Sequence, residues 1–418
     1  MRNSLRKFIP PFLISWYHYI LSFSSALFYG FPSRKLTVIG VTGTNGKSTV
    51  VEMISRILEA DARDAASISS IGFKIKGKEC PNNLRMTMPG RFFIQRFFRS
   101  AVKEGCKYAV LEVTSEGIKQ HRHQFIDFSA AILTNLSPEH LEAHGGLENY
   151  RRAKMELFKK AKVHIINIDD ASADLFLKIP APVKYGYALG NGTKEEIRII
   201  RGDFLSGGSG GVSFRAEQTV FNLKLKGFFN AYNALATVCF ALWQKIDLET
   251  VKRALEGIKV IPGRMEEVVS FPFRVFVDYA FTPNALEKVY QALKKDFKPA
   301  KMVCVLGACG GGRDKWKRPV LGELAARYCD EIIVTNEDPY DEDPVEIMKQ
   351  VSSGAKGKSL EMIDRRQAIG KGLTLLGAGD LMIITGKGCE SSICLKGGKR
   401  IGWDDRKAVL EELEKIRR

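Results

Sequence analysis

The sequence predicts an α/β protein with three parts: a short helical N-terminal segment, a central P-loop domain of the ATPase type on a parallel sheet, and a C-terminal doubly wound, Rossmann-like domain. Three observations predict this fold class. A strand, a glycine turn and a helix follow one another at residues 36–58, short apolar runs ending in polar residues come next, and a second such series begins near residue 263. With 418 residues and 45% hydrophobic content, the chain can form two or three domains.

The N-terminal segment is apolar. Residues 8–33 contain no Asp, Glu, Lys or Arg, and the basic residues that flank them are Arg2, Arg6, Lys7, Arg34 and Lys35. Their length suits a membrane span, but Pro10, Pro11, five serines and a histidine favour a packed or interfacial helix. No small-residue cleavage site indicates a signal peptide. We expect a packed helix or peripheral membrane contact through residues 8–33, with a transmembrane anchor as the alternative.

The phosphate-binding loop comes next. Residues 36–41 form a β-branched run that predicts a buried parallel strand, and residues 48–58 carry an apolar stripe at helical spacing. Gly43 and Gly46 between them let backbone N–H groups point at an anion, Lys47 adds a positive charge, and Ser48 or Thr49 can hold Mg²⁺. A valine stands at the first glycine of the G-x-x-x-x-G-K-[ST] pattern, so a purely structural junction is the alternative. The residues expected to bind nucleotide here are Gly43, Thr44, Asn45, Gly46, Lys47, Ser48 and Thr49.

Three further apolar runs, "YAVLEV" (108–113), "AAILTN" (130–135) and "VHIINID" (163–169), predict parallel strands whose carboxyl ends carry the site. Glu112 closes the first run and is placed to bind Mg²⁺, with a helix N-cap as the alternative. His140 follows the second run, and on its own such a histidine is more often structural than a ligand. Lys154 falls in the middle of the apolar face of a predicted helix, where a lysine must snorkel, pair with an acid or be modified.

Glycine-rich and proline-containing stretches divide the rest of the chain. "LSGGSGG" (205–211) predicts a hairpin loop or linker, and "VIPGRMEE" (260–267) a domain boundary. The second strand series is "FRVFVDYA", "KMVCVLGA", "EIIVTNED" and "LMIITGKG". We therefore predict an N-terminal segment at 1–35, a central domain at 36–262 and a C-terminal domain at 263–418, with the active site between the last two.

Charge and cysteine usage narrow the function. A net charge of +17 suits an anionic partner, and because no basic motif is interleaved with aromatic residues, a small anionic molecule is favoured over nucleic acid. The eight cysteines include no C-x-x-C pair, which favours a reducing cytoplasm. Two C-x₄-C spacings could suggest zinc, but no histidine cluster accompanies them, so zinc is disfavoured.

These features together resemble a known family. The matching stretches run from about residue 36 to 405 and are "GVTGTNGKST", "MTMPG", "LEVTSEGIKQHR", "LTNLSPEHLEAHGGLENYRRAKMELF", "GFFNAYNALA", "PGRMEE", "DYAFTPNAL", "GGRDKWKRP", "EDPYDEDP" and "GKGCE". They resemble the Mur ligases, most closely the MurE type, the UDP-N-acetylmuramoyl-dipeptide:amino-acid ligases of peptidoglycan synthesis. The family's own phosphate loop has the same shortened form.

The resemblance implies an ATP-dependent ligase that converts the carboxylate of a bound muramyl peptide to an acyl phosphate, which an amino acid's amine then attacks. Catalytic roles are implied for Lys47, Glu112, His140 and Lys154. Mg²⁺ ligation is implied for Ser48, Glu112, His140 and Lys154, the last as a carbamate formed with CO₂. Further ATP contacts are implied for Asn230, Asn233, Arg264 and Asp278. The implied muramyl-substrate residues are Thr87, Ser115 and Arg122, and the implied amino-acid residues are Arg313, Asp338, Tyr340, Gly386 and Glu390.

Some positions depart from the family pattern. Diaminopimelate-specific members carry "DNPR" where this chain has "EDPY", and the loss of that Arg with the gain of Asp338 favours a lysine-like diamine. Glu116, Phe281 and Cys389 each replace a family histidine, which puts substrate contacts in doubt more than ATP chemistry. Only about 35 residues precede the first strand, so we expect the family's uridine-binding domain to be missing, and a lipid-linked acceptor is one hypothesis.

Rival interpretations share parts of this pattern. Folylpolyglutamate and cyanophycin synthetases use the same ATPase core, but "DYAFTPNAL", "GGRDKWKRP" and "GKGCE" point away from them. The MurT-type ligase carries a four-cysteine insertion that this sequence lacks. A membrane-associated nucleotide-binding scaffold without ligase activity is the alternative outside enzymes, and Lys47, Lys154 and Asp278 argue against it. We expect a cytoplasmic monomer, with membrane association through residues 8–33 as a further expectation.

Overall fold

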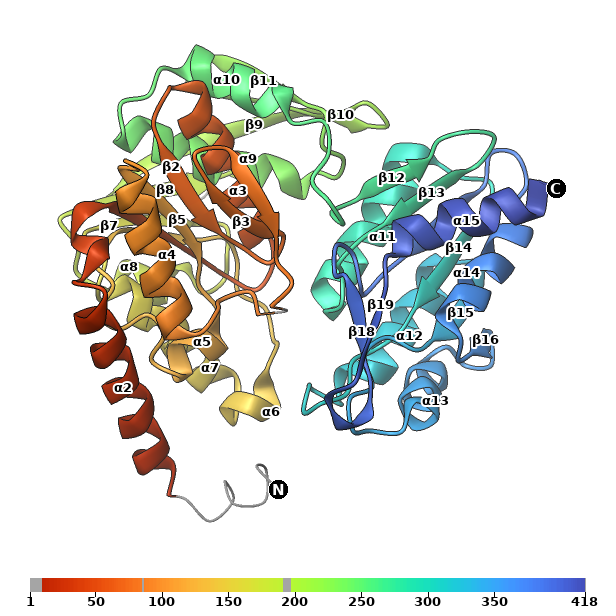
Figure 1. Ribbon diagram of the computed structural model, residues 1–418. Coiled ribbons are helices and arrows are strands. Elements are labelled where there is room, and N and C mark those ends of the chain that lie inside the picture. Colours follow the sequence, from red (N-terminus) through yellow and green to blue (C-terminus); the bar gives the residue numbers. More distant parts are fainter. Residues whose placement is uncertain (1–9, 85, 191–196, 418) are drawn as a thin grey trace.

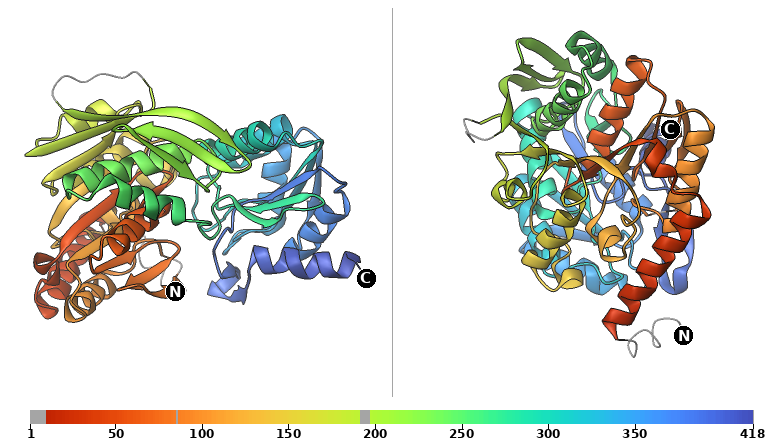
Figure 2. Two further views of the ribbon diagram at one scale, coloured as in Figure 1. Left: turned by 90° about the horizontal axis from the view of Figure 1, so that it is seen from above. Right: turned by 90° about the vertical axis from the view of Figure 1, so that its left-hand side faces the viewer.

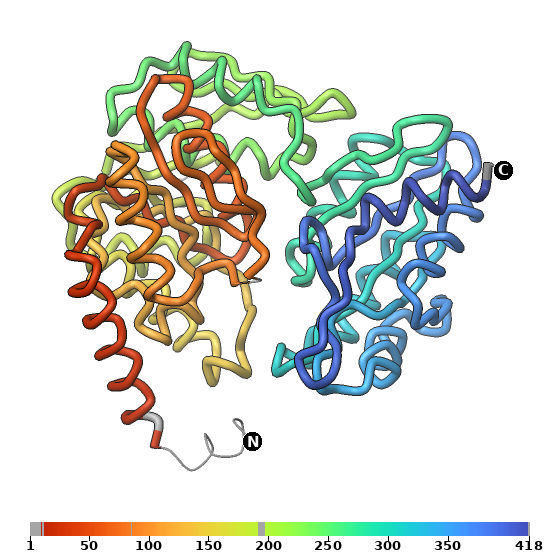
Figure 3. Tube along the Cα trace, viewed as in Figure 1, coloured from red at the N-terminus to blue at the C-terminus, as the bar shows by residue number. Residues whose placement is uncertain are grey.

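The computed structural model describes residues 10–84, 86–190 and 197–417, so residues 1–9 of the predicted N-terminal segment lie outside the described part. The chain forms two α/β bodies side by side: a central body (residues 37–257) and a C-terminal body (residues 266–417), and it passes once from the first to the second (Figure 3). Each body has one large sheet with helices on both faces (Figures 1 and 2). The predicted fold class is confirmed.

The sheet of the central body has eleven strands in the order β11-β10-β9-β8-β7-β6-β1-β5-β2-β3-β4. Its seven middle strands are parallel and its edges are antiparallel hairpins. The strands are β1 (Thr37–Thr42), β2 (Ala65–Ile68), β3 (Gly72–Ile75), β4 (Lys78–Pro81), β5 (Tyr108–Glu112), β6 (Phe128–Leu133), β7 (Val163–Asn167), β8 (Val183–Ala188), β9 (Arg198–Gly208), β10 (Gly211–Ala216) and β11 (Thr219–Leu223). The predicted loop at 205–211 is a tight hairpin, because β9 and β10 extend into it from both sides.

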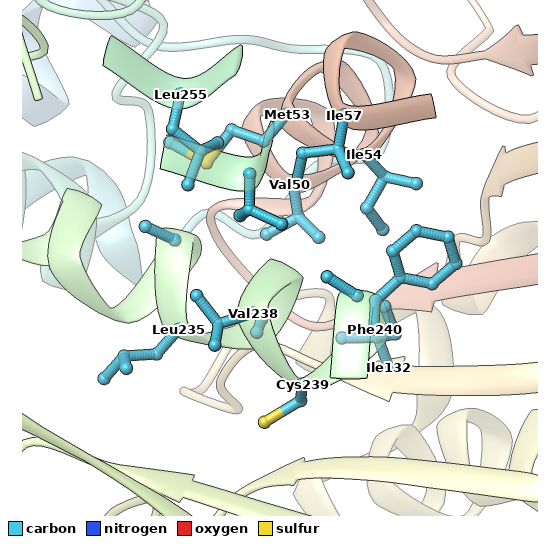
Figure 4. Packing of buried hydrophobic residues seen from close by; sticks show 14 of the residues in the cluster. Val50, Met53, Ile54, Ile57, Ile132, Leu235, Val238, Cys239, Phe240 and Leu255 are labelled. Atoms are coloured by element: carbon cyan, nitrogen blue, oxygen red, sulfur yellow. The ribbon is translucent and has the colours of Figure 1, made fainter. Parts of the chain in front are cut away.

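Helices cover both faces of this sheet, as a parallel sheet requires. The helices are α2 (Pro11–Phe28), α3 (Lys47–Ala60), α4 (Arg91–Lys103), α5 (Ser115–Lys119), α6 (Leu141–His144), α7 (Leu147–Phe158), α8 (Ala173–Leu177), α9 (Phe229–Trp243) and α10 (Leu248–Gly257), with a 3-10 turn at Pro32–Lys35. Helices α3, α9 and α10 pack together on one face, where Met53, Val238 and Leu255 lie in a shared apolar core (Figure 4). Helices α4, α7 and α8 cover the other face.

The C-terminal body is a doubly wound sheet in the order β12-β13-β17-β14-β15-β16, parallel except for β12. Its elements are β12 (Glu266–Val269), β13 (Arg274–Val277), α11 (Pro283–Phe297), β14 (Met302–Leu306), α12 (Lys317–Tyr328), β15 (Glu331–Thr335), α13 (Pro344–Gly354), β16 (Ser359–Met362), α14 (Arg365–Thr374), β17 (Leu381–Ile384) and α15 (Asp405–Arg417). A small hairpin, β18 (Ser392–Cys394) and β19 (Arg400–Gly402) around a 3-10 turn at Lys396–Gly398, stands apart from the sheet.

Local chemistry fixes where two helices begin beside the site. The Thr114 side chain accepts a hydrogen bond from the Gly117 N–H at 3.0 Å and caps α5. The Thr282 hydroxyl accepts one from the Ala285 N–H at 3.2 Å and caps α11, whose first residue is Pro283. Both caps lie at carboxyl ends of strands, so they hold polar loops at the same edge of each sheet.

Helix α2 packs along α4 on the side of the central body that faces away from the C-terminal body (Figure 1). The view from that side shows α2 along nearly its whole length (Figure 2). Within the described ranges, none of the helices combines the length and apolar character that a membrane crossing needs. The packed helix expected for this segment is confirmed for its described residues.

Candidate active site

A cleft of about 790 Å³ lies between the two bodies and is lined by residues of both. On the central side it lies at the carboxyl ends of β1, β5 and β6, which are neighbours in the sheet. On the C-terminal side it is lined by the loops that follow β13, β14, β15 and β17. The cleft is therefore lined by all the site residues that were predicted from both halves of the sequence.

The loop predicted to bind phosphate, residues 43–49, requires its glycines. Gly43 and Gly46 have φ angles of 149° and 83°. A Cβ atom at Gly43 would lie 1.9 Å from Thr134 Oγ1, and one at Gly46 would lie 2.4 Å from Asn233 Oδ1. A backbone hydrogen bond to the segment after β6 also holds the loop, because the Thr44 N–H donates to the Asn135 carbonyl at 2.8 Å. These contacts give the loop a fixed shape before any anion binds.

Lys47, Ser48 and Glu112 meet at the base of the loop. The Lys47 ammonium lies 2.9 Å from the Thr44 carbonyl and 3.8 Å from Glu112 Oε1, and the Ser48 hydroxyl donates to Glu112 Oε2 at 2.9 Å. Burial lowers the pKa of Lys47, while Glu112 opposes that shift and Arg264 adds to it. A hydroxyl and a carboxylate side by side are the oxygen ligands that Mg²⁺ prefers.

This ligand set is small. Within residues 10–84, 86–190 and 197–417, no group of three or more His, Cys, Asp or Glu side chains is arranged to hold a metal ion by itself. Mg²⁺ usually keeps several waters and takes one or two carboxylates together with substrate phosphates, so the pair of Ser48 and Glu112 fits Mg²⁺ that arrives with a nucleotide.

Lys154 is buried beside the loop. Its amine donates to the Gly43 carbonyl at 2.7 Å and lies 4.7 Å from the centre of the Tyr150 ring. Burial lowers its pKa well below the ordinary lysine value, and the nearby charge of Lys47 lowers it further. The helix face around it is formed by Tyr150 and Leu157, both fully buried, as the sequence pattern predicts. A neutral, nucleophilic amine is therefore favoured at this position.

His140 lies at the start of α6 with a φ of 56°, a left-handed conformation that is uncommon for a residue other than glycine. Burial, with the charges of Arg313 and Lys317, lowers its pKa to about 2. The imidazole is therefore neutral at physiological pH, which is the state that can coordinate a metal ion. It lines the same cleft as Glu112 and Lys154.

The remaining residues expected at the nucleotide come from both bodies. On α9, the Asn233 amide donates to Asn230 Oδ1 at 3.0 Å. Arg264, from the C-terminal side, donates to the Ser48 and Ser70 hydroxyls at 3.2 and 3.0 Å. The Asp278 carboxylate accepts the N–H of Met265, which follows Arg264 in the sequence, at 2.7 Å, and the N–H of Ala280 in its own loop at 2.6 Å. The guanidinium is thus already positioned over the phosphate-binding loop.

At the end expected to hold the muramyl substrate, Thr87, Ser115 and Arg122 all line the cleft. The Arg122 guanidinium donates to the Met88 carbonyl and to Gln120 Oε1, the latter at 2.7 Å. Glu116, which replaces a family histidine, lies 3.5 Å from His144 Nε2. The structure therefore brings the three predicted residues to the lining of the same cleft.

On the C-terminal side, Arg313, Asp338, Tyr340, Gly386 and Glu390 line the cleft together. The Asp338 carboxylate is engaged within the protein: Lys387 Nζ lies 2.9 Å from each of its oxygens, and the Cys394 N–H donates to it at 2.7 Å. Lys387 also lies 2.6 Å from Glu390 Oε2. Asp338 therefore gives little support to the selection of an ammonium group, for which its sequence position argued.

Sequence reasoning missed several residues of the cleft. Lys387 and Glu337 line or support the amino-acid end, and Glu139 and Lys317 join the two bodies. Glu337 is buried, accepts a hydrogen bond from the Cys309 thiol at 2.8 Å, and has a raised pKa because of burial. The only sequence signal for these residues was that they adjoin predicted ones.

The sequence of this chain is similar to those of known proteins. The chain matches the Mur ligase middle domain over residues 41–241 and the domain described as "Mur ligase, glutamate ligase domain" over residues 263–388. It is 36% identical to the UDP-N-acetylmuramoyl-L-alanyl-D-glutamate--2,6-diaminopimelate ligase of Syntrophomonas wolfei, over 94% of this chain and 81% of that protein.

Solved structures of other proteins have a similar fold. A structure of a UDP-N-acetylmuramoyl-L-alanyl-D-glutamate--2,6-diaminopimelate ligase superposes with a TM-score of 0.62 at 31% identity, over 92% of this chain and 79% of that one. A folylpolyglutamate synthase of Mycobacterium tuberculosis superposes with a TM-score of 0.70 at 19% identity, over 87% of this chain and 91% of that one. The second likeness shows a shared fold alone.

Proposed function

This chain belongs to the Mur ligase family, and on that premise we propose that it joins an amino acid to the free carboxylate of a UDP-N-acetylmuramoyl-dipeptide-like acceptor at the expense of ATP. It is an ATP-dependent ligase that forms an amide through an acyl phosphate, in peptidoglycan precursor synthesis. One observation carries the assignment of the site. Lys47, Glu112 and Lys154 from the central body line the same cleft as Arg264 and Arg313 from the C-terminal body.

At the nucleotide end, we assign the β- and γ-phosphates to the loop of residues 43–49, with Lys47 against their charge. Arg264 extends over the same loop from the other body, where it can neutralise charge that develops on the transferred phosphoryl group. Asn230 and Asn233 are assigned to the adenine side, and Asp278 holds the loop of Arg264 in place.

Ligases of this family use ATP and Mg²⁺. We assign the metal to Ser48, Glu112 and His140, with Lys154 as a carbamate. Bound Mg²⁺ would neutralise phosphate charge and orient the phosphates. Support for the carbamate is the burial of Lys154, since its lowered pKa keeps the amine neutral and able to add CO₂. The product would turn a buried neutral amine into an anion next to the oxygen ligands.

The acceptor carboxylate lies, in this proposal, between Arg122 and the phosphate loop. One of its oxygens attacks the γ-phosphorus, ADP leaves, and the acyl phosphate forms. The amine of the amino acid then attacks the acyl carbon, the C–O bond breaks, and phosphate leaves with that oxygen. No side chain of the enzyme becomes covalently attached. The protein contributes positioning and charge neutralisation, which act without reorganisation at the moment of reaction.

The amino acid is proposed to bind at the end formed by Arg313, Tyr340, Gly386 and Glu390, where Arg313 can hold its α-carboxylate. Tyr340 is a neutral phenol, because burial raises its pKa above the usual value. It cannot make the bidentate contact that an arginine makes with a distal carboxylate. A lysine-like diamine therefore remains our proposal, although the named relatives are 2,6-diaminopimelate ligases.

The setting of the reaction is also proposed. The protein would work in the cytoplasm as a monomer and contact the membrane peripherally through residues 8–33. The domain limits at residues 35 and 262 are supported by the two separate sheets. The UDP group would need contacts at the end of the cleft near Thr87 and Arg122.

The test is a reconstituted reaction. Purified protein is mixed with ATP, Mg²⁺, UDP-muramyl dipeptide and a panel of amino acids, and products are weighed by mass spectrometry. We expect a tripeptide product together with ADP and phosphate, only when acceptor and amino acid are both present. Nucleotide binding without any such product would instead support a scaffold without ligase activity.

A further inference from the structure

Helix α2 is oriented with its polar side inward and its apolar side outward. The side chains of His18, Ser22 and Ser25 are 7%, 1% and 0% exposed. On the outer side the exposed fractions lie between 52% and 65% for five large apolar or aromatic residues, Phe12, Trp16, Tyr17, Ile20 and Leu27. A helix on the surface of a globular protein ordinarily has the opposite arrangement.

Hydrogen bonds fix this orientation. The Arg91 guanidinium, at the start of α4, lies 3.2 Å from the Ser22 hydroxyl and 3.0 Å from His18 Nδ1. The Ser15 hydroxyl lies 2.7 Å from His121 Nε2. Turning the helix to bury its aromatic side would separate these partners, and a buried polar group without a hydrogen-bond partner is destabilising. The outward aromatic face is therefore a stable property of the fold.

The surroundings of this face are basic. The first acidic residue of the chain is Glu52, whereas Arg2, Arg6 and Lys7 precede the helix in the sequence and Arg34 and Lys35 follow it. Arg34 and Lys35 are exposed, and so are Arg96 and Arg99 of the adjacent α4. Each basic residue near an anionic membrane surface adds to the electrostatic attraction between the protein and that surface. Trp16 and Tyr17 add rings that combine an apolar body with a polar edge, which suits the interface of a bilayer.

From this geometry we propose that the outer face of α2 lies in the headgroup region of an anionic phospholipid bilayer, parallel to the membrane plane. The inference makes specific the peripheral contact proposed above and rests on it. The inward side of α2 bonds Arg91 and His121, and Arg91 also donates to the Gln120 carbonyl at 2.7 Å. Since Gln120 lines the cleft beside Arg122, Arg91 links the inward side of α2 to the lining of the proposed acceptor site.

The experiment uses the full chain and two kinds of vesicle. Flotation with phosphatidylglycerol vesicles is compared with flotation on phosphatidylcholine vesicles, and Trp16 insertion is followed by quenching with brominated lipid. We expect at least tenfold stronger partitioning to phosphatidylglycerol, reduced at least fivefold when ionic strength is raised. A chain that fails to float with phosphatidylglycerol vesicles would overturn the proposal.

A matched pair of variants tests the face itself. Trp16→Ser, Ile20→Ser and Leu27→Ser together should lower partitioning at least tenfold without changing the melting temperature. The control, Phe271→Ser, Ile363→Ser and Ile416→Ser, removes three equally exposed apolar side chains elsewhere and should partition like the wild type. Equal partitioning of both variants would overturn the proposal, and so would a dimer of the wild type that the first variant converts to monomer. Ligase activity with a soluble acceptor, measured on the same samples, separates failure here from failure of the proposed function.

Discussion

Glu139 and Lys317 form a buried ion pair that joins the two bodies: the Lys317 ammonium lies 2.7 Å from Glu139 Oε1, and each side chain is 3% exposed. Next to this pair, the Asp314 carboxylate accepts the N–H groups of Leu141 and Glu142, both at 3.0 Å. His140 lies between the bonded residues in the sequence. The C-terminal body therefore bonds the residue before His140 and the two residues after it. These bonds hold the proposed metal ligand in place.

Replacing Lys317 by Met should destabilise the protein by about 3–5 kcal/mol, because it leaves the Glu139 carboxylate buried without its partner. The double variant Glu139→Gln with Lys317→Met should recover a large part of that loss. Urea unfolding of the single and double variants measures the coupling. Lys315→Met is the matched control, since its side chain is 59% exposed and its partner Glu342 is 3.8 Å away. A Lys317→Met variant as stable as the control would contradict the account.

Gly46→Ala should weaken ATP binding at least tenfold, because the new Cβ would displace Asn233 from the loop. Gly77→Ala separates this effect from backbone strain: its φ of 74° is close to the 83° of Gly46, but a Cβ there meets nothing within 4 Å. In both variants, the left-handed conformation of the new alanine lowers the free energy of unfolding by about 1–2 kcal/mol. Calorimetric titration with a non-hydrolysable ATP analogue should show lost affinity for Gly46→Ala only, and equal affinities would argue against the loop assignment.

Lys154 should carry a carbamate when CO₂ is present. Protein equilibrated with ¹³C-labelled bicarbonate is expected to give a carbamate carbon resonance, since the buried amine has a lowered pKa and is held neutral. Lys154→Arg should abolish both the resonance and at least 99% of ligase activity. Lys159→Arg, an exposed lysine at the end of the same helix, should change neither. A resonance that persists in Lys154→Arg would place the carbamate elsewhere.

Tyr340→Arg should move amino-acid preference toward diaminopimelate. A guanidinium at this position gains a charge-assisted contact with a distal carboxylate, worth about 1.5–3 kcal/mol, or roughly tenfold or more in relative kcat/KM. Tyr340→Phe should keep the wild-type preference, because it adds no charge. The measurement is kcat/KM for lysine and diaminopimelate with each protein. A wild type that already prefers diaminopimelate would show that the inference from Tyr340 is wrong.

The sequence predicts best what depends on neighbouring residues. The phosphate loop is evident because Gly43, Gly46 and Lys47 lie within a few positions, and Lys154 stands out because a charge interrupts an apolar helical stripe. Strand positions follow from short apolar runs, although β6 begins two residues earlier than the quoted run, at Phe128. Such signals are local, so they survive without knowledge of the tertiary structure.

Features that depend on distant partners could not be predicted. Glu139 and Lys317 are separated by 178 positions, and Asp338 meets Lys387 across 49. The local pattern around Asp338 therefore suggests a role in selecting an ammonium group. In the tertiary structure, its carboxylate is bonded to Lys387 of the protein itself. The orientation of α2 is a similar case, since its apolar spacing does not reveal that Arg91 and His121 bind its polar side.

The central claim is that the enzyme activates an acid group with ATP, and oxygen transfer tests it most directly. The acceptor carboxylate is labelled with ¹⁸O, the ligation is run with ATP, Mg²⁺ and the preferred amino acid, and the released phosphate is examined by ³¹P NMR. The account predicts one ¹⁸O atom in each phosphate, carried over when the amine displaces it from the acyl carbon. Phosphate without label, released while the amide product forms, would contradict it.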